Sequence, residues 1–320
     1  MEGKKTVKVI SPGMLTTVQD RGRFGYGRYG VAPSGALDSL ALRVANMLVD
    51  NLEDEACLEI TMMGPELGAL TDVTIAITGA DLTPCINGTA IQMWRSWRLK
   101  PGDLLSCKTV VYGCRAYLAI GGGIDVPSVM GSKSTNLGSG FGGLGGGPLI
   151  AGDVLYGKSP ELHLKAAGRH FDLNDTPAYS NDWCLRVLLG PQDDQFSQSG
   201  LELFLQSVFT VSPQSDRTGI RLHGPAVETK EGVPESIISE GIIPGAIQVP
   251  GDGQPIIILG ETISGGYRKI ATVISADMHL PGQMVPGDRV QFQAVCLWEA
   301  RSALWRLEEK IARFRNKLTG

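Results

Sequence analysis

Short apolar runs separated by glycine and proline recur along the whole chain. Six of them are rich in β-branched residues: KTVKVIS (5–11), TDVTIAIT (71–78), RAYLAIGG (115–122), WCLRVLLG (183–190), QPIIILG (254–260) and KIATVIS (269–275). Runs of this length between turn residues are typical of β-strands, and the regular alternation of strand and helix that a doubly wound sheet needs is missing. The pattern predicts a mainly β protein, a barrel or a sandwich.

A Gly-Asp pair precedes a strand-like run at three places. The segments are LKPGDLLSC from Leu99, LIAGDVLYG from Leu149 and MVPGDRVQF from Met284. Glycine supplies a backbone conformation that other residues avoid, and aspartate can hydrogen-bond backbone two residues further on. The spacing is too irregular for a solenoid. The three turns therefore indicate similar β-units used in more than one lobe.

Helical periodicity appears in two segments. Between residues 37 and 48 apolar side chains recur at helical spacing, and Asn51 is a suitable C-terminal stop. Near the C-terminus the spacing predicts an amphipathic tail helix, with apolar positions Leu297, Ala300, Leu304, Leu307, Ile311, Phe314 and Leu318. This helix can pack on its own chain, or offer the stripe of Leu304, Leu307, Ile311 and Phe314 to a partner.

The segment 168–183 is polar and rich in turn residues, so we place a lobe boundary there. The expected organisation is an N-terminal β-barrel lobe, 1–180, that carries the glycine-rich loops. A C-terminal β-barrel lobe, 181–320, includes the tail helix.

Composition narrows the class of protein. The chain has 320 residues, 42% hydrophobic and 19% charged, with a net charge of −4 and no long basic stretch, so nucleic acid or an acidic membrane surface is not an expected partner. No apolar run reaches the roughly 18 residues of a membrane span. The opening MEGKKTVKVI is expected to form a first strand instead of a signal peptide.

Cysteine usage favours a reducing compartment. The six cysteines are scattered without a CxxC pair or a neighbouring histidine, so neither a zinc site nor a redox dithiol is predicted. Four lie in apolar runs and are expected to be small buried side chains: Cys107, Cys114, Cys184 and Cys296. We expect a cytoplasmic protein.

The stretch TVQDRGRFGYGRYGVAPSGALDS (17–39) concentrates charge on a flexible loop just before the first predicted helix. Ser34 or Asp38 can cap that helix, and free N–H groups at a helix start attract anions. Arginine recognises carboxylates and phosphates through a two-pronged guanidinium, and Arg21, Arg23 and Arg28 lie close by in sequence. The stretch is interpreted either as an anion-recognition loop or as a solvated loop with ordinary turn glycines.

Two further stretches could line a binding site. GSKSTNLGSGFGGLGGGP (131–148) is either a ligand-covering loop or a long connection, and it does not match the phosphate loop GxxxxGK[ST]. In 239–277, Gln248 lies on an apolar strand, and Tyr267, Arg268 and Lys269 follow a Gly-Gly pair. A few polar groups in an apolar surrounding are what a ligand pocket requires. The four histidines are isolated from one another and from any acid–nucleophile pattern. Catalysis is therefore expected to depend on substrate positioning and electrostatic stabilisation.

In combination, TVQDRGRFGYGRYGVAPSGALD, GSKSTNLGSGFGGL, SDRTGIRLHG and SEGIIPGAIQVPGDGQPI with GGYRKIATVISAD resemble the biotin-dependent carboxyltransferase family. That family includes the C-type subunit of 5-oxoprolinase, subunit 2 of allophanate-hydrolase-type proteins and the matching part of urea carboxylase. The resemblance extends over roughly Val7 to Phe292.

The resemblance implies β-barrel lobes of cyclophilin-like topology and a partner subunit that resembles a sporulation-kinase inhibitor. In 5-oxoprolinase, the resemblance implies, a third, lactam-utilisation subunit joins the complex, and ATP drives the opening of a lactam. In urea carboxylase, the matching domain transfers a carboxyl group from carboxybiotin to urea. We expect any ATP to act through the complex, and any biotin to be attached to another protein. A 5-oxoprolinase-type subunit is the first expectation, a carboxyltransferase for urea or another small amide the second, and a non-catalytic binding module the third.

The chain departs from the family pattern in the third stretch. An acid and a glutamine are usual where Gly260 and Thr262 stand, and Arg268 occupies the place of a proline. SDRTGIRL replaces a usual Ser-Asn-Arg-Met-Gly-Tyr-Arg-Leu, and Gly147 stands where an arginine is common. Missing polar groups in a pocket alter substrate specificity.

Residues and resemblance together give a set of candidate site residues without metal ligands. The predicted catalytic residues are Asp20, Arg23, Lys133, Gln248 and Tyr267. The predicted substrate-binding residues are Arg21, Tyr26, Ser34, Gly35, Asp38, Ser132, Ser134, Arg217 and Lys269.

Overall fold

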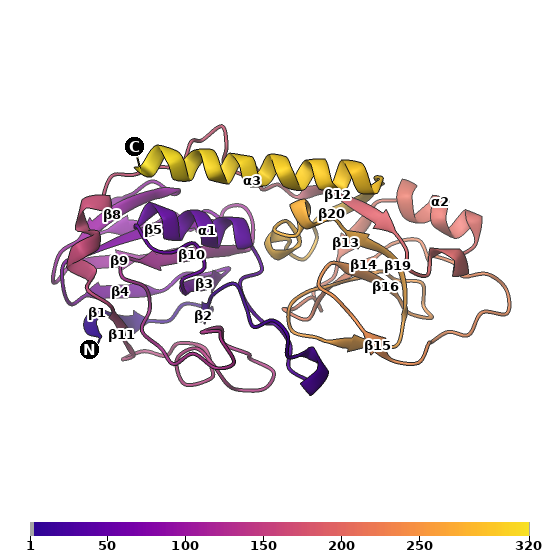
Figure 1. Cartoon of the computed structure of the whole chain (residues 1–320), viewed down its shortest axis with the longest axis horizontal. Coiled ribbons are helices and arrows are strands. Elements are labelled where there is room, and N and C mark those ends of the chain that lie inside the picture. Colours follow the sequence, from indigo (N-terminus) through magenta and orange to yellow (C-terminus); the bar gives the residue numbers. More distant parts are fainter. Residues whose placement is uncertain (1–2, 320) are drawn as a thin grey trace. The chain divides into compact units, whose positions relative to one another are not determined.

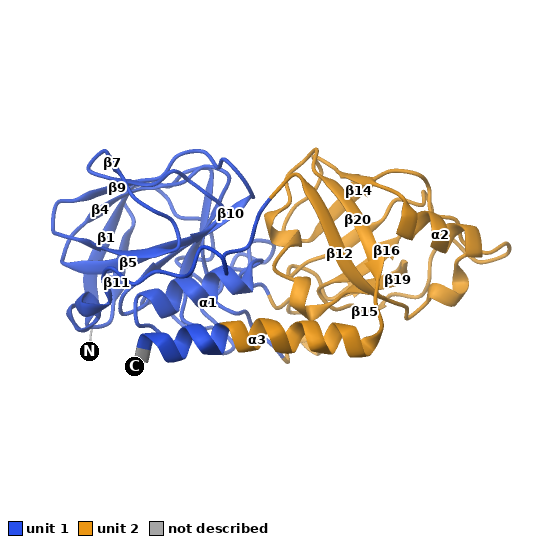
Figure 2. Cartoon of the chain, turned by 90° about the horizontal axis from the view of Figure 1, so that it is seen from above, with its two compact units in different colours: residues 1–24, 34–179, 311–320 blue, residues 25–33, 180–310 orange. Residues whose placement is uncertain are grey.

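A computed structural model of the chain describes residues 3–319, and its elements are labelled in Figure 1. Contacts between Cα atoms group the chain into two units (Figure 2): unit 1 holds the described residues within 1–24, 34–179 and 311–320, and unit 2 holds 25–33 and 180–310. The expected lobes, 1–180 and 181–320, differ from this grouping at the short segments 25–33 and 311–320. The second segment groups with unit 1 because Ile311 is fully buried and Phe314 packs edge-on against Phe171, with ring centroids 4.8 Å apart.

Unit 1 contains two antiparallel sheets. The six-stranded sheet has the order β11-β1-β4-β9-β6-β7 and the bounds β1 Lys4–Ser11, β4 Glu66–Ala69, β6 Cys85–Ile86, β7 Thr89–Ala90, β9 Leu104–Ser106 and β11 Val154–Gly157. The five-stranded sheet has the order β2-β3-β10-β5-β8 and the bounds β2 Leu15–Gln19, β3 Cys57–Thr61, β5 Val73–Gly79, β8 Arg95–Leu99 and β10 Arg115–Ile120.

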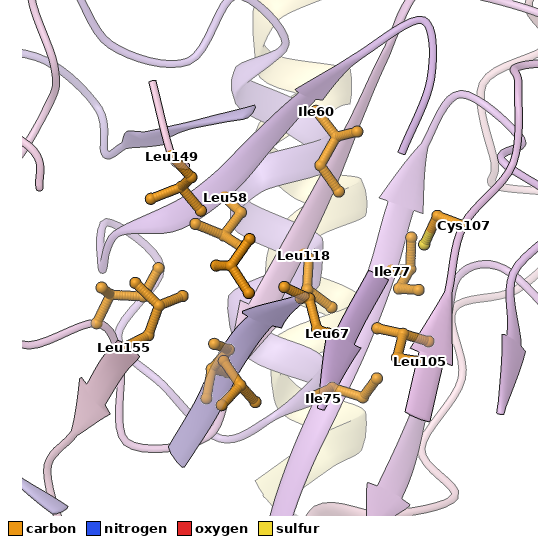
Figure 3. Close-up of a cluster of buried hydrophobic side chains, with 14 of the residues drawn as sticks. Leu58, Ile60, Leu67, Ile75, Ile77, Leu105, Cys107, Leu118, Leu149 and Leu155 are labelled. Carbon is orange, nitrogen blue, oxygen red and sulfur yellow. The ribbon is translucent and has the colours of Figure 1, made fainter. Parts of the chain in front are cut away.

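One hydrophobic core joins the two sheets of unit 1. Side chains from both sheets meet in it, as Figure 3 shows for Leu67 and Leu105 of the six-stranded sheet and for Leu58, Ile77 and Leu118 of the five-stranded sheet. Alternating strand residues place one apolar set on the inner face of each sheet. Unit 1 is therefore a sandwich in which the strands surround a shared core.

Helix α1 (Ser39–Leu48) packs on the five-stranded sheet of unit 1. It contacts β5 and β10, and Thr78 Oγ1 donates a hydrogen bond of 2.7 Å to the carbonyl of Ala41. The predicted helix over 37–48 is confirmed, as is Asp38 as its cap, because the Asp38 carboxylate accepts from Ala41 N at 2.8 Å. A short 3₁₀ helix, η2 (Pro160–Ala166), completes the regular structure of this unit.

Unit 2 is built on a closed barrel of seven strands in the order β12-β19-β16-β17-β14-β13-β20. Their bounds are β12 Asp182–Leu189, β13 Phe209–Val211, β14 Gly219–His223, β16 Ala246–Val249, β17 Ile256–Ile258, β19 Arg268–Val273 and β20 Arg289–Ala294. Strands β12 and β20 run parallel, and the other pairs are antiparallel. A two-stranded sheet pairs β15 (Glu240–Gly241) with β18 (Ser264–Gly265).

The helices of unit 2 are few and mostly short. They are α2 Gln198–Gln206, η1 Gly27–Tyr29, η3 Asp193–Gln195, η4 Ser275–Asp277 and η5 Pro281–Gln283. The six predicted β-branched runs all contain strands, namely β1, β5, β10, β12, β17 and β19. A mainly β fold with a barrel, few helices and a C-terminal helix is thus confirmed.

The tail helix α3 (Leu297–Thr319) is confirmed, but its apolar stripe is not free for a partner. Ala300 and Ala303 join a buried cluster with Ile274 and Ala276 in unit 2, and Ile311 and Phe314 are buried in unit 1. The helix therefore uses this stripe on its own chain. Among the described residues, no helix has the length and apolarity that crossing a membrane requires.

The three Gly-Asp turns share one structure. Each glycine has a positive φ between 91° and 96°, and each turn feeds a strand: β9, β11 or β20. The aspartates accept backbone hydrogen bonds from three residues earlier, not from two residues later as the sequence suggested: Lys100 N to Asp103, Ile150 N to Asp153 and Val285 N to Asp288 at 2.7–3.0 Å. These bonds close the turn backwards, and the one from Lys100 is the main reason why the pKa of Asp103 is lowered.

The cysteine prediction is confirmed for Cys107 and Cys114, which are buried, and is wrong for Cys184 and Cys296, which are exposed. Cys184 lies on β12, whose residues alternate between core and solvent, and it falls on the outer face. Cys296 precedes α3, outside any strand. An apolar run therefore does not bury every member of a strand.

Candidate functional site

Two glycine-rich stretches far apart in sequence meet at the carboxylate of Asp20 in unit 1. Its Oδ1 accepts hydrogen bonds from Gly22 N, Ser132 Oγ and Ser134 Oγ at 2.7, 2.6 and 2.5 Å, and its Oδ2 accepts from Lys133 N at 2.6 Å. Asp20 is buried, and with Arg23, Ser132, Lys133 and Ser134 it is called the Asp20 cluster below. A carboxylate that accepts this many bonds orders the loop around it.

Arg23 is also buried and is engaged within the loop. Its guanidinium donates to the carbonyl of Ser134, more weakly to that of Val129 at 3.5 Å, and lies 4.7 Å from the ring centroid of Phe141. Gly142 allows this approach, because a Cβ there would lie 2.1 Å from the Ser134 carbonyl oxygen. Arg23 is thus covered in this geometry and its predicted role toward a ligand stays a prediction, whereas Arg21 is exposed.

The Lys133 side chain points away from the Asp20 carboxylate. Its ammonium group donates to a carboxylate oxygen of Glu55 and, at 3.0 Å, to the carbonyl of Ile124. Only the backbone N–H of Lys133 reaches Asp20. In this structure Lys133 connects the glycine-rich loop to the segment after α1, and its predicted catalytic role stays a prediction.

The start of α1 offers no free anion site. The Asp38 carboxylate occupies it as the cap, is fully buried, and accepts a second hydrogen bond from Tyr179 Oη at 2.8 Å. The backbone N–H of Asp38 donates to Tyr117 Oη at 2.8 Å, and Tyr117 Oη donates to Glu59 at 2.7 Å. Burial is the main cause that raises the pKa of Tyr117 well above its ordinary value. The expected anion at this helix start is therefore replaced by the protein's own carboxylate.

Ser34 and Gly35 form a tight corner beside Arg21 and Gly22. Gly35 has φ +88°, and a Cβ there would lie 2.8 Å from Gly22 N. Ser34 has φ +55°, unusual for a residue with a side chain, and its buried hydroxyl has no hydrogen-bond partner among residues 3–319. Strain combined with an unsatisfied hydroxyl is typical of functional sites. The predicted substrate-binding role of Ser34 keeps this physical support.

Tyr26 lies apart from these residues in the contact grouping. It belongs to the segment 25–33, which groups with unit 2, and its half-buried ring lies 6.5 Å from that of Tyr29.

A second cluster lies where β16 and β19 pair in the barrel of unit 2. A register shift after Ile247 brings Gln248 opposite Lys269. Directly opposed residues present their side chains on the same face of a sheet, and such irregularities re-aim side chains near sites. Gln248 is buried and donates to the carbonyl of Tyr267 at 3.2 Å.

The buried Lys269 pairs with an exposed acid. Its ammonium group donates to Glu240, whose carboxylate also accepts from Gln192 Nε2 at 2.6 Å. The hydrogen bond from Lys269 is the main cause that lowers the pKa of Glu240. Together with Gln248 and Tyr267, which is 41% exposed, these residues are called the Lys269 cluster.

An acid of the diverged third stretch forms a buried ion pair with an arginine outside that stretch. Arg217, a predicted substrate-binding residue, donates through Nε to Glu261 at 3.1 Å, and both side chains are 7% exposed. Arg268 is buried and donates to Gln195 Oε1 at 2.6 Å. An acid therefore remains in this stretch, at the position after Gly260.

The structure thus brings eight of the predicted residues into two groups, one within each unit. Asp20, Arg23, Ser132, Lys133 and Ser134 share one, and Gln248, Tyr267 and Lys269 share the other. Sequence reasoning missed four partners of these groups: Glu55, Gln192, Glu240 and Glu261. Two of the four, Glu240 and Glu261, lie inside the third stretch, so a search there for acids near Lys269 and Arg217 would have found them.

The glycine-rich loop does not fit a nucleotide phosphate. The hydroxyls of Ser132 and Ser134 and the N–H of Lys133 are donors of the kind that binds phosphate, but all three are directed at the Asp20 carboxylate. A phosphate at this place would meet a negative charge. We therefore assign no ATP contact to this loop.

Comparison with known proteins agrees with this architecture. A family model described as "Carboxyltransferase domain, subdomain A and B" matches residues 29–294. The chain is 40% identical over 301 residues to the C-type subunit of 5-oxoprolinase from Escherichia coli, covering 93% of this chain and 94% of that protein. It is 37% identical over 313 residues to urea amidolyase of Lachancea kluyveri, covering 92% of this chain but only 17% of that longer protein.

Solved structures give the same result. The urea amidolyase of K. lactis matches with a TM-score of 0.92 and 34% identity, over 98% of this chain and 20% of that one. The urea carboxylase of Kluyveromyces lactis matches with a TM-score of 0.90 and 35% identity, over 98% of this chain and 29% of that one. The chain therefore belongs to the family of carboxyltransferase domains that comprise subdomains A and B.

Proposed function

We propose that this protein is the C-type subunit of a 5-oxoprolinase complex, which opens a small cyclic amide together with partner subunits. The observation that carries the proposal is the 40% identity to the C-type subunit of a 5-oxoprolinase across 93% of one chain and 94% of the other. A second C-type subunit of 5-oxoprolinase, from Haemophilus influenzae, is 32% identical over 296 residues. Both relatives are named as subunits, which supports dependence on partners.

The Lys269 cluster is the part of unit 2 best suited to a small amide. Tyr267 is half-exposed, and the Glu240 carboxylate is solvent-accessible while Lys269 fixes its position. A hydroxyl and a positioned carboxylate can hydrogen-bond the oxygen and the N–H of an amide. In unit 1, the exposed guanidinium of Arg21 is available for a substrate carboxylate.

The chemistry calls for a contribution from another subunit. Amide opening needs an activated carbonyl, and the carboxylate of Asp20 is already engaged by donors of the loop 131–148. We propose that a subunit resembling a sporulation-kinase inhibitor, with a lactam-utilisation subunit, supplies the activation and any ATP site. This assembly, and a cytoplasmic location, remain predictions.

A second candidate is transfer of a carboxyl group to urea or another small amide from biotin on a separate protein. The TM-scores of 0.92 and 0.90 to a urea amidolyase and a urea carboxylase favour it. The third candidate, a non-catalytic binding module, rests on Gly260 and Thr262, where the family usually has an acid and a glutamine. The buried Glu261 weakens that argument, because a carboxylate is retained beside them.

The test is reconstitution of the purified chain with the subunits encoded by its neighbouring genes. We expect no glutamate or phosphate release from 5-oxoproline and ATP with the chain alone, and turnover with the complete set. Tyr267→Phe should lower turnover without a change in melting temperature, and the same substitution at the exposed Tyr112 is the control. Turnover by the chain alone would contradict the proposal. Carboxylation of urea by a biotin carboxylase partner would favour the second candidate, and inactivity in all mixtures the third.

A further inference from the structure

A pocket of about 560 Å³ opens in unit 1, outside both clusters described above. Its walls come from the turn at 81–85, the hairpin of β6 and β7, the segment 90–95 and the residues 170–173. None of its lining residues belongs to the Asp20 cluster or to the Lys269 cluster.

The pocket has the lining of a small-molecule site. Trp94 and Phe171 are almost completely buried, and their ring centroids lie 5.7 Å apart; Ile91, Met93 and Pro84 add further apolar surface. Volumes of roughly 300–1,000 Å³ with mainly apolar walls are usual for sites that hold drug-sized molecules. Urea and 5-oxoproline are much smaller than such molecules, so the pocket suits a larger and more apolar ligand.

The polar groups around this apolar lining are mainly basic. Arg95, Lys108 and His170 line the pocket, against the single carboxylate of Asp81. The Nε of Arg95 is buried and has no hydrogen-bond acceptor among the described residues, although its Nη1 donates to Gln92 Oε1 at 3.3 Å. The guanidinium also lies 5.2 Å from the ring centroid of Trp97. Two cationic side chains, Arg95 and Lys108, against one carboxylate leave an excess of positive charge that favours an anionic group in the pocket.

The backbone of the pocket wall is strained at two lining residues. Trp94 has φ +57° and Thr83 has φ +44°, in the left-handed region that residues with bulky or β-branched side chains avoid. Trp94 is held there by a hydrogen bond of 2.7 Å from its N–H to the carbonyl of Ile77 on β5. Such strain is typical of ligand-binding sites, where the surrounding structure fixes a side chain in a working position.

We infer that this pocket binds a small organic anion that has an apolar aromatic or aliphatic body. The body would fill the space beside Trp94 and Phe171, and the anionic group would pair with Arg95 and Lys108. This inference goes beyond the proposed function, because it concerns a separate site and does not depend on which amide the complex acts on.

Cys85 makes a direct test possible in the unaltered chain. Cys85 lines the pocket and is half-buried, while Cys184 and Cys296 are exposed in unit 2 and serve as internal controls. Burial raises the pKa of Cys107 to about 12, so this thiol does not compete for an alkylating reagent. The chain is labelled with iodoacetamide in the presence of decanoate, of decanol or of neither. Mass spectrometry then measures the labelling of each cysteine.

We expect decanoate to slow the alkylation of Cys85 alone, and decanol to need about a 10-fold higher concentration for the same protection. Equal protection by the acid and the alcohol would overturn the anionic part of the inference. Unchanged labelling of Cys85 at saturating decanoate, or equal slowing at Cys184 and Cys296, would overturn it entirely.

Variants give an independent measurement with the fluorescent anion 8-anilinonaphthalene-1-sulfonate. Ala90→Trp places a large side chain in the pocket from an exposed strand position and should abolish binding. Lys108→Gln should weaken binding about 2- to 5-fold, because exposed charges contribute modestly. Lys8→Gln, on an exposed residue of β1 outside the pocket, should leave it unchanged. Equal affinity in all four proteins would refute the site, and equal melting temperatures exclude misfolding as the cause of any difference.

Discussion

The two charged clusters differ in which partner is buried. In unit 1 the carboxylate of Asp20 is buried and accepts hydrogen bonds from Gly22 of its own loop and from Ser132 and Ser134 of a distant loop, and Arg23 is buried beside it. In unit 2 the cation, Lys269, is buried, and its acid Glu240 is 46% exposed at the side chain. The carboxylate of the first cluster therefore has its acceptors used within the protein, whereas the second cluster presents a carboxylate to solvent.

Because of this difference, we expect the carboxylates of Asp20 and Glu240 to have different roles. A carboxylate that holds backbone and hydroxyl donors from a distant loop acts on the shape of that loop. A carboxylate fixed by a buried lysine but open on its other side can contact a ligand. We therefore expect substitutions in the Asp20 cluster to act mainly on stability, and those in the Lys269 cluster mainly on activity.

The largest expected effect follows from removal of the Asp20 carboxylate. Asp20→Ala leaves the donors of Ser132, Lys133 and Ser134 without their acceptor, and we expect a loss of about 3–5 kcal/mol in the free energy of unfolding. Urea unfolding measures the loss, and hydrogen exchange of residues 129–143 locates it.

Asp194→Ala is the matched control for this experiment, because Asp194 is an exposed acid outside the cluster. It should change stability by less than about 0.5 kcal/mol. If Asp20→Ala were as stable as Asp194→Ala, with the same exchange in 129–143, the structural role of the Asp20 cluster would be wrong.

A smaller effect is expected for Arg23, and its neighbour Arg21 provides the control. Arg23→Ala removes a buried side chain that donates to Ser134 and packs on Phe141, and should cost about 2–3 kcal/mol. Arg21→Ala changes an exposed side chain and should cost less than about 0.5 kcal/mol. The measurement is the melting temperature of both variants. Equal decreases in melting temperature would contradict the different burial of the two arginines.

The fold was accessible from the sequence because strand and helix patterns are local. The β-branched runs, the period of residues 37–48 and the tail helix were all confirmed, since each depends on spacing within a few residues. Cys184 shows the limit of that reasoning, because a mainly apolar run such as WCLRVLLG does not reveal which of its residues face solvent.

The site was only partly accessible because its partners are distant in sequence. Lys133 pairs with Glu55, which is 78 residues away, and Lys269 pairs with Glu240, which is 29 residues away. Nothing in the stretch around Arg21 and Arg23 shows which arginine is exposed and which is buried, since both adjoin Gly22 in the same flexible stretch. Only the position of the second loop, near Ser134, decides which of them is covered.

The smallest expected effect is a dependence of stability on pH that comes from Glu240. The hydrogen bond from Lys269 lowers the pKa of Glu240 below 4.5, so the folded protein favours the ionised carboxylate more than the unfolded chain does. The stabilising contribution is present above the ordinary pKa and is lost as the pH falls through the lowered value. The melting temperature of the parent protein relative to Glu240→Gln should therefore be highest near neutral pH, and the difference should shrink below pH 4.5.

The variant Glu231→Gln, at an exposed acid without this partner, should show no such trend. A difference that stayed constant through this range would mean that Glu240 gains nothing from Lys269 in the folded state. The contrast between the Asp20 cluster and the Lys269 cluster would then depend on the observations in unit 1 alone.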